Sequence, residues 1–196
     1  MVVPFVGLTG GIGAGKSTAL AALERLGAAC LSTDRVVHEL YERPEVRDTM
    51  VARFGPGVLA AGEIDRSALA QRAFATPADR SWLEGQLWPR VGTRMASWRE
   101  QLERSWPRPR VAVVEIPLLF ESGMDGAFDA TIAVLADEEV RAERAAARGH
   151  EALEERSTRQ LSQQEKALRA TYTVLNDGTV DELERKLSAV LDMLAR

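Results

Sequence analysis

A glycine-rich segment near the N-terminus carries the strongest chemical signal in the sequence. Residues 10–17 read GGIGAGKS and fit the pattern G-x-x-x-x-G-K-[ST] without a mismatch. In this pattern the glycines let backbone N–H groups approach phosphate oxygens, while the lysine and the hydroxyl suit a triphosphate and Mg²⁺. A glycine-rich turn with an incidental lysine is the alternative interpretation. The complete pattern favours a loop that binds a nucleoside triphosphate.

The segments on either side of the loop predict the frame that such a loop needs. Val2–Leu8 is an apolar run typical of a doubly covered parallel strand, and the sequence after the loop predicts a helix that stops at Gly27. A second short strand is expected over Ala28–Leu31, which completes a strand-helix-strand unit and aims the helix dipole at the phosphates. We expect the nucleotide to be bound by Gly11, Gly13, Ala14, Gly15, Lys16, Ser17 and Thr18, with Ser17 also binding Mg²⁺.

The rest of the chain continues the alternation of strands and helices. Further strands are expected over Val111–Leu119, Ala130–Leu135 and Tyr172–Leu175, and further helices after Asp137, over Glu151–Ala170 and over Val180–Ala195. The region 35–105 is predicted to be helical, with one helix starting at Thr76. Its tryptophans, Trp82 among them, are expected to pack between helices, and stacking on a base is the alternative. The pattern predicts an α/β fold with a parallel sheet of five strands.

Composition narrows the class of protein. The chain has 196 residues, of which 45% are hydrophobic, and a net charge of −4. Such a length suits one compact domain, and the charge argues against general nucleic-acid or membrane binding. Neither a membrane span nor a secretory signal is apparent, so we expect a cytoplasmic protein with a small-molecule partner, either monomeric or weakly homo-oligomeric. Cys30, the single cysteine, excludes an intrachain disulfide and is expected to be buried.

Three classes of protein use such a loop: small-molecule kinases, GTPase switches and ATP-driven motors or transporters. A GTPase is disfavoured because the guanine-recognition motif N/T-K-x-D is absent; the only asparagine, Asn176, is followed by Asp177 and Gly178. A transporter is disfavoured because LSQQ at 161–164 lacks the glycines of the transporter signature. A small-molecule kinase is therefore favoured.

One acidic residue lies where the acceptor of a phosphoryl group is expected. Ligands of open parallel sheets gather beyond the carboxyl ends of the strands. Asp34 follows the predicted strand Ala28–Leu31 by three residues. A carboxylate there can orient or deprotonate an attacking hydroxyl, so Asp34 is our candidate for the catalytic base. The alternative is that Asp34 caps a helix that begins at Arg35.

A group of arginines predicts a second functional surface. Arg141, Arg144 and Arg148 are spaced to lie on one face of a helix. Such a face can balance the charge of the transferring phosphoryl group, and closing it over the triphosphate would exclude water. Neighbouring glutamates can also neutralise these arginines, so an ordinary solvated face is the alternative.

Four stretches together make the sequence similar to the dephospho-CoA kinase family. They are GLTGGIGAGKST at 7–18, LSTD at 31–34, EIPLLFESG at 115–123 and an R-x-x-x-Q…K…N-D-G tail that ends at Gly178. They occur in the family's order and span nearly the whole chain. The resemblance implies a P-loop NTPase three-layer fold and ATP-dependent phosphorylation of the 3′-hydroxyl of dephospho-CoA. The products are coenzyme A and ADP, in the last step of coenzyme A biosynthesis, with ATP and Mg²⁺ as cofactors.

The resemblance also implies roles for parts of the chain and for single residues. The core is expected at about 1–34, 106–140 and 170–196, a helical coenzyme A substrate domain at about 35–105 and a lid at about 141–169. Asp34, Lys16 and Arg144 are the implied catalytic residues, and Arg148 and Asn176 join the nucleotide site. Glu121 is implied to shape the substrate pocket or to bind Mg²⁺ through water. The implied substrate-binding residues are Asp34, Leu118, Glu121 and Arg156.

The sequence departs from the family pattern at a few positions. Ser32 stands in place of the first acid of a D-A-D motif, so a hydroxyl or water must substitute if that acid helps to hold magnesium. Glu115 interrupts an apolar strand and receives no role. Two alternatives stay open: another P-loop kinase acting on a nucleotide or a small alcohol, and a non-catalytic ATP-binding module.

Overall fold

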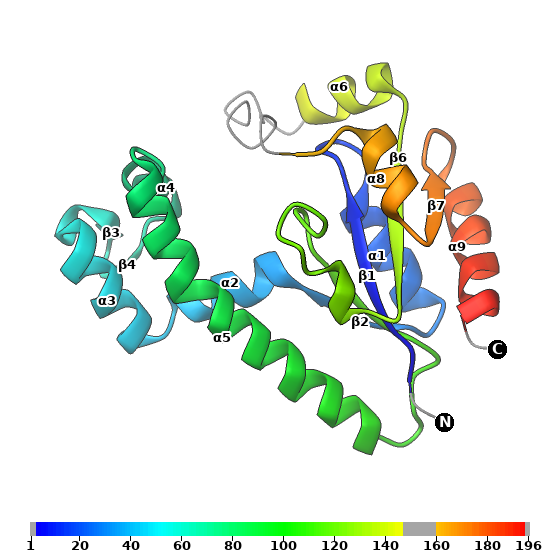
Figure 1. Cartoon of the computed structure of the whole chain (residues 1–196), viewed down its shortest axis with the longest axis horizontal. Coiled ribbons are helices and arrows are strands. Elements are labelled where there is room, and N and C mark those ends of the chain that lie inside the picture. The colour runs from blue at the N-terminus through cyan, green and yellow to red at the C-terminus, as the bar shows by residue number, and fades with distance from the viewer. Residues whose placement is uncertain (1–2, 147–159, 195–196) are drawn as a thin grey trace. The chain divides into compact units, whose positions relative to one another are not determined.

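The computed structural model describes residues 3–146 and 160–194 (Figure 1). The chain divides into two compact units, one formed by Met1–Ser32 with Arg99–Arg196 and the other by Thr33–Trp98. None of the helices in the described ranges is long and apolar enough to cross a membrane.

The first unit is built on a parallel sheet in the order β2-β5-β1-β6-β7. Strands β1, β5 and β6 are buried almost throughout, which explains why their sequences are apolar runs without alternation. The predicted parallel sheet of five strands is confirmed. The strands are β1 (Phe5–Gly10), β2 (Ala29–Ser32), β5 (Ala112–Glu115), β6 (Ala130–Leu135) and β7 (Tyr172–Leu175).

The bounds of β6 and β7 agree with the prediction, whereas β5 is shorter. A strand was predicted over Val111–Leu119, but β5 ends at Glu115 and a turn begins at Pro117. Proline has no N–H to donate to a ladder, so the apolar residues after it leave the sheet and pack as a turn. The prediction of a strand beyond Glu115 was therefore wrong.

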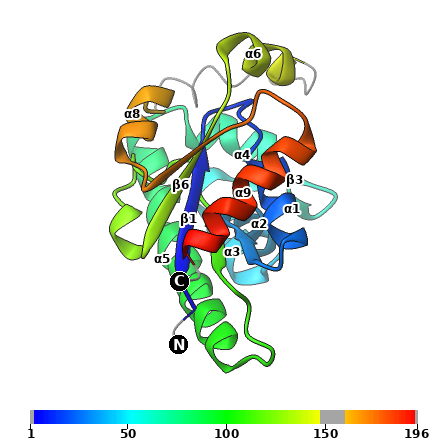
Figure 2. The same ribbon diagram turned by 90° about the vertical axis from the view of Figure 1, so that its right-hand side faces the viewer.

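Helices and a long turn cover the two faces of this sheet. Helices α1 (Lys16–Arg25) and α9 (Val180–Leu194) pack together and share a core with the β-strands on one face (Figures 1 and 2). On the other face, a Cβ at Gly7 would lie 2.9 Å from the Leu119 side chain, and Phe128 stacks on Phe5 at 4.9 Å. The turn that includes η2 (Asp125–Ala127) therefore covers that face, and the three-layer prediction is confirmed.

Two further helices follow β6. Helix α6 (Glu138–Ala146) is as predicted in the described range. The predicted helix Glu151–Ala170 is not continuous, because α8 (Gln163–Arg169) starts only after a capping box formed by Ser162 and Glu165. The Ser162 hydroxyl accepts from the Glu165 N–H, the Glu165 carboxylate accepts from the Ser162 N–H, and these bonds fix a helix start there.

The second unit is helical, as predicted, with one small addition. Its elements are α2 (Thr33–Tyr41), α3 (Pro44–Phe54), η1 (Pro56–Val58), β3 (Leu59–Ala60), β4 (Glu63–Ile64), α4 (Arg66–Ala73) and the start of α5 (Pro77–Arg104). The two-residue strands form an antiparallel hairpin that the sequence analysis missed. Trp82 packs edge-to-face on Phe54 at 5.5 Å, which confirms its packing role.

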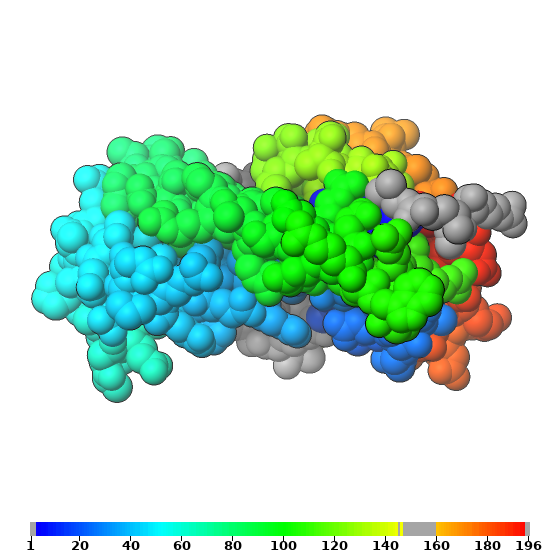
Figure 3. Space-filling view, turned by 90° about the horizontal axis from the view of Figure 1, so that it is seen from below, coloured from blue at the N-terminus to red at the C-terminus, as the bar shows by residue number. Residues whose placement is uncertain are grey.

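The long helix α5 starts where Thr76 predicted. The Thr76 hydroxyl accepts from the Asp79 N–H at 3.1 Å and donates to its carboxylate at 2.8 Å. The hydrogen bond that the Thr76 hydroxyl donates to the carboxylate is the largest cause of a lowered pKa of Asp79, and a hydrogen bond from Arg53 is the second. The helix continues through Pro89 to Arg104, and its atoms are the green ones in Figure 3.

Candidate active site

The glycine-rich loop joins β1 directly to α1. Gly13 and Gly15 have φ angles of 77° and 90°, which only glycine adopts without strain. Gly15 is also the N-cap of α1 and has no side chain to cap it, so the first N–H groups of the helix suit an anion. The Lys16 ammonium donates to the carbonyls of Gly10 and Gly11 at 3.1 and 3.2 Å. The predicted loop residues are thus gathered at the positive end of a helix.

Asn176, which follows the last residue of β7, forms a hydrogen bond with this loop. Its side chain is buried and donates from Nδ2 to the carbonyl of Ala14 at 2.9 Å, while its N–H donates to Leu135. The structure therefore brings Asn176 to the glycine-rich loop and shows a contact with the loop backbone. A Cβ at Gly15 would collide with the Asn176 amide nitrogen.

Gly15→Ala is expected to weaken ATP binding by about tenfold or more, because it strains the backbone and displaces the amide that supports Ala14. The matched control is Gly27→Ala at the other end of α1. Gly27 has a φ of 87° but no heavy atom within 4 Å of its added Cβ. Titration with a fluorescent ATP analogue checks the prediction. Equal losses of affinity in the two variants would show that the contact with Asn176 is irrelevant.

Two arginines of α6 reach the same loop. Arg141 donates from Nε to the carbonyl of Ile12 at 2.9 Å and pairs with Glu138 at 2.8 Å. Arg144 donates to the carbonyl of Asn176 at 2.9 Å. Arg144 thus lies beside the glycine-rich loop, and Arg141, which the sequence analysis placed on the same helix face, contacts the loop backbone directly. Arg148 lies outside the described residues.

The turn after β5 holds the predicted substrate residues Leu118 and Glu121. Leu118 is half-buried. The Glu121 carboxylate accepts from the Lys166 ammonium at 2.6 Å and from the Leu161 N–H at 2.8 Å. Lys166 has no exposed surface and also donates to the carbonyl of Pro117 at 3.3 Å. Glu121 therefore belongs to a buried ion pair that ties α8 to this turn.

Asp34 and Arg156 are the remaining predicted substrate residues. Helix α2 begins at Thr33, so Asp34 lies inside its first turn and does not precede the helix as a cap. Its side chain is exposed, and it belongs to the unit Thr33–Trp98. Arg156 lies outside the described residues.

Glu115, which received no role from the sequence, is buried at the end of β5 with 7% of its surface exposed. Its carboxylate accepts from the Ser32 hydroxyl at 2.7 Å. The signal that could have found it is an acid at the carboxyl end of a strand in a parallel sheet.

The oxygen ligands available beside the glycine-rich loop suit a magnesium ion. Among the described residues, no cluster of three His, Cys, Asp or Glu side chains could hold a metal ion. Mg²⁺ does not need such a cluster, since it is usually held by one or two protein oxygens, phosphates and water. Ser17, at the start of α1, offers a hydroxyl of this kind.

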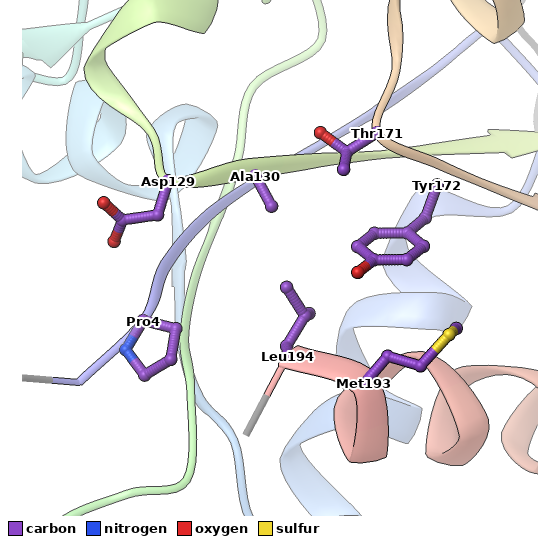
Figure 4. Close-up of a pocket in the computed structure, with 7 residues that line it drawn as sticks. All are labelled: Pro4, Asp129, Ala130, Thr171, Tyr172, Met193 and Leu194. Carbon is purple, nitrogen blue, oxygen red and sulfur yellow. The ribbon is translucent and has the colours of Figure 1, made fainter. Parts of the chain in front are cut away.

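A depression of about 430 Å³ lies at the end of the sheet where the strands begin (Figure 4). Its lining includes Pro4, Asp129 and Thr171, each of which directly precedes a strand. The five strands of this sheet are parallel, so the depression lies at the opposite end of the sheet from the carboxyl ends of the strands, where the loop lies. None of the predicted site residues in the described part of the chain lines it, so it is separate from the loop and its neighbours.

Comparison with known proteins agrees with this geometry. The family model for dephospho-CoA kinase matches residues 4–182. The dephospho-CoA kinase of Deinococcus radiodurans is 41% identical over 194 residues, covering 96% of this chain and 91% of the relative.

Two solved structures are similar over nearly the whole chain. TT1252 from Thermus thermophilus has a TM-score of 0.82 at 34% identity, with 99% of both chains covered. Dephospho-CoA kinase from Campylobacter jejuni has a TM-score of 0.65 at 20% identity, with 99% of this chain and 98% of that chain covered, and shows the same fold. By its sequence and its fold, this chain belongs to the dephospho-CoA kinase family.

Proposed function

We propose that the protein transfers the γ-phosphate of ATP to the 3′-hydroxyl of dephospho-CoA, giving coenzyme A and ADP. The observation that carries the proposal is the match of a dephospho-CoA kinase family model to residues 4–182, in a chain whose phosphate loop is intact. Since both substrates are intracellular nucleotides, we place this activity in the cytoplasm.

The residues of the loop and its neighbours have different proposed roles in binding ATP and in the transfer. The N–H groups at the start of α1 and the Lys16 ammonium bind the β- and γ-phosphates, and the Ser17 hydroxyl binds Mg²⁺. When bound, Mg²⁺ would neutralise charge on those phosphates. Arg144, placed beside the loop by its bond to Asn176, stabilises the charge of the transferring phosphoryl group.

Asp34 is the proposed base that orients the acceptor hydroxyl and takes its proton. It follows β2 at the carboxyl edge of a parallel sheet, where such sheets bind their ligands. The helical unit Thr33–Trp98 is the proposed substrate domain, and residues 141–169 the proposed lid. Leu118 and Glu121, in the turn after β5, are proposed to line the substrate site.

A panel of acceptors tests the proposal. The protein is incubated with Mg-ATP and dephospho-CoA, nucleoside monophosphates or small alcohols such as shikimate, and products are separated by chromatography. We expect coenzyme A from the first reaction and no phosphorylated product from the others. Transfer to another acceptor alone would select a different P-loop kinase, and ATP binding without any transfer would select a non-catalytic module.

A further inference from the structure

Gln163, the first residue of α8, makes a paired contact with the backbone of a single residue outside its own helix. Its side-chain Oε1 accepts from the Ala136 N–H at 2.9 Å, and its Nε2 donates to the Ala136 carbonyl at 2.7 Å. Ala136 is only 2% exposed, so its backbone groups have little access to water and need partners in the protein. One side-chain amide supplies both partners, as a neighbouring strand would.

Ala136 lies in the short junction that leads from the sheet into α6. Strand β6 ends at Leu135 and α6 begins at Glu138, so Ala136 and Asp137 form the whole connection. The Asp137 N–H donates to the carboxylate of Asp177 at 2.6 Å. Figures 1 and 2 show α8 beside β6, and β6 leading into α6. Side chains from two later segments therefore hold both residues of the junction.

The position of Arg144 depends on how this junction holds the base of α6. Arg144 lies six residues after Glu138, which is about 9 Å along the helix axis. A tilt of about 10° at the base would therefore move Arg144 by roughly 1.5 Å. Such a shift would break the hydrogen bond that Arg144 donates to the Asn176 carbonyl at 2.9 Å. Misplacement of a reacting or charge-balancing group by about 1 Å is enough to change binding and rate.

We propose that Gln163 is a positioning residue that holds the base of α6, and through it Arg144, in place for the γ-phosphate of ATP. The inference rests on the proposed function, in which Arg144 balances the charge of the transferring phosphoryl group. Gln163 bonds the backbone of Ala136, so its effect on the nucleotide passes through α6. An amide suits this role because it offers a donor and an acceptor at once.

A comparison of two nucleotides tests this role without any acceptor substrate. Gln163→Met keeps the length of the side chain and removes both hydrogen bonds. It is expected to weaken binding of a non-hydrolysable ATP analogue about fivefold and binding of ADP less than twofold, because only the analogue carries a γ-phosphate. Isothermal titration calorimetry with Mg²⁺ present measures both affinities. The matched control is Gln164→Met, at the next and exposed position of α8, which is expected to bind both nucleotides as the wild type does.

A double-mutant cycle shows whether the effect passes through Arg144. Arg144→Met alone is expected to weaken binding of the analogue at least as much as Gln163→Met does. Adding Gln163→Met to Arg144→Met is then expected to weaken it less than twofold further. The same fivefold loss in both backgrounds, or an equal loss of affinity for the analogue and for ADP, would overturn the positioning role.

Gln163→Glu keeps the test decisive if Gln163→Met fails to fold, which circular dichroism would show. It keeps the acceptor for the Ala136 N–H but places an oxygen opposite the Ala136 carbonyl, so the analogue is expected to bind about threefold more weakly, with ADP binding unchanged. Wild-type affinity for the analogue in the variant that folds would overturn the role. Coenzyme A formation by the wild-type protein does not depend on these results, so the proposed function is tested separately.

Discussion

Replacing Asp34 with asparagine is expected to lower kcat for coenzyme A formation by about 10²–10⁴-fold, with ATP binding nearly unchanged. Asparagine keeps the shape of the side chain but cannot take a proton from the acceptor hydroxyl. Asp34 is exposed in the first turn of α2 and does not belong to the unit that carries the phosphate loop, so contacts of the loop with ATP stay intact. Steady-state kinetics and an ATP titration measure the two quantities.

The matched control is Asp48→Asn, at an exposed position of α3 where the carboxylate pairs with the adjacent Arg47. Its kcat is expected to equal that of the wild type. If Asp34→Asn also kept kcat within about threefold of the wild type, Asp34 would be reduced to a favourable charge at a helix N-terminus.

The second large effect concerns stability. Lys166→Met is expected to lower the free energy of unfolding by about 3–5 kcal/mol, because it leaves the Glu121 carboxylate buried without its cation. The Lys166 ammonium is fully buried 2.6 Å from Glu121 Oε1, and Glu121 Oε2 has no hydrogen-bond partner among the described residues. Urea denaturation at pH 7 measures the loss.

A double-mutant cycle separates the ion pair from simple loss of packing. Glu121→Gln combined with Lys166→Met removes both charges and keeps an acceptor for the Leu161 N–H, so much of the stability should return. Lys186→Met is the surface control. Lys186 bonds only one carbonyl in the described structure, and its replacement is expected to cost less than about 1 kcal/mol. A single-variant loss as small as that of the control would contradict the account.

The sequence predicted those features that arise from neighbouring residues. The loop at 10–17 could be recognised because its glycines, lysine and hydroxyl are consecutive and lie between a strand and a helix. The bounds of β6 and β7 could be predicted because both are short segments rich in aliphatic, β-branched or aromatic residues, with Asp129 before β6 and Asn176 after β7. The start of α8 was missed although its signal is also local, since Ser162 and Glu165 fit the capping-box spacing.

The sequence could not predict pairs that only the fold brings together. Asn176 and Ala14 are 162 residues apart, and Lys166 and Glu121 are 45 apart. Asn176 was assigned to the nucleotide site only through the family resemblance, and its bond to the loop backbone was not foreseen. The ion pair of Lys166 could not be predicted, because the spacing along α8 alone does not show that its ammonium meets a carboxylate from the turn after β5.

Phosphorus NMR of the reaction mixture tests the central claim most directly. With Mg-ATP and dephospho-CoA, we expect one new phosphomonoester signal, assigned to the 3′-position of coenzyme A, to grow in step with ADP. The same mixture with the Lys16→Ala protein should show neither signal. Loss of ATP without that phosphomonoester, or a phosphate attached elsewhere on the acceptor, would contradict the account.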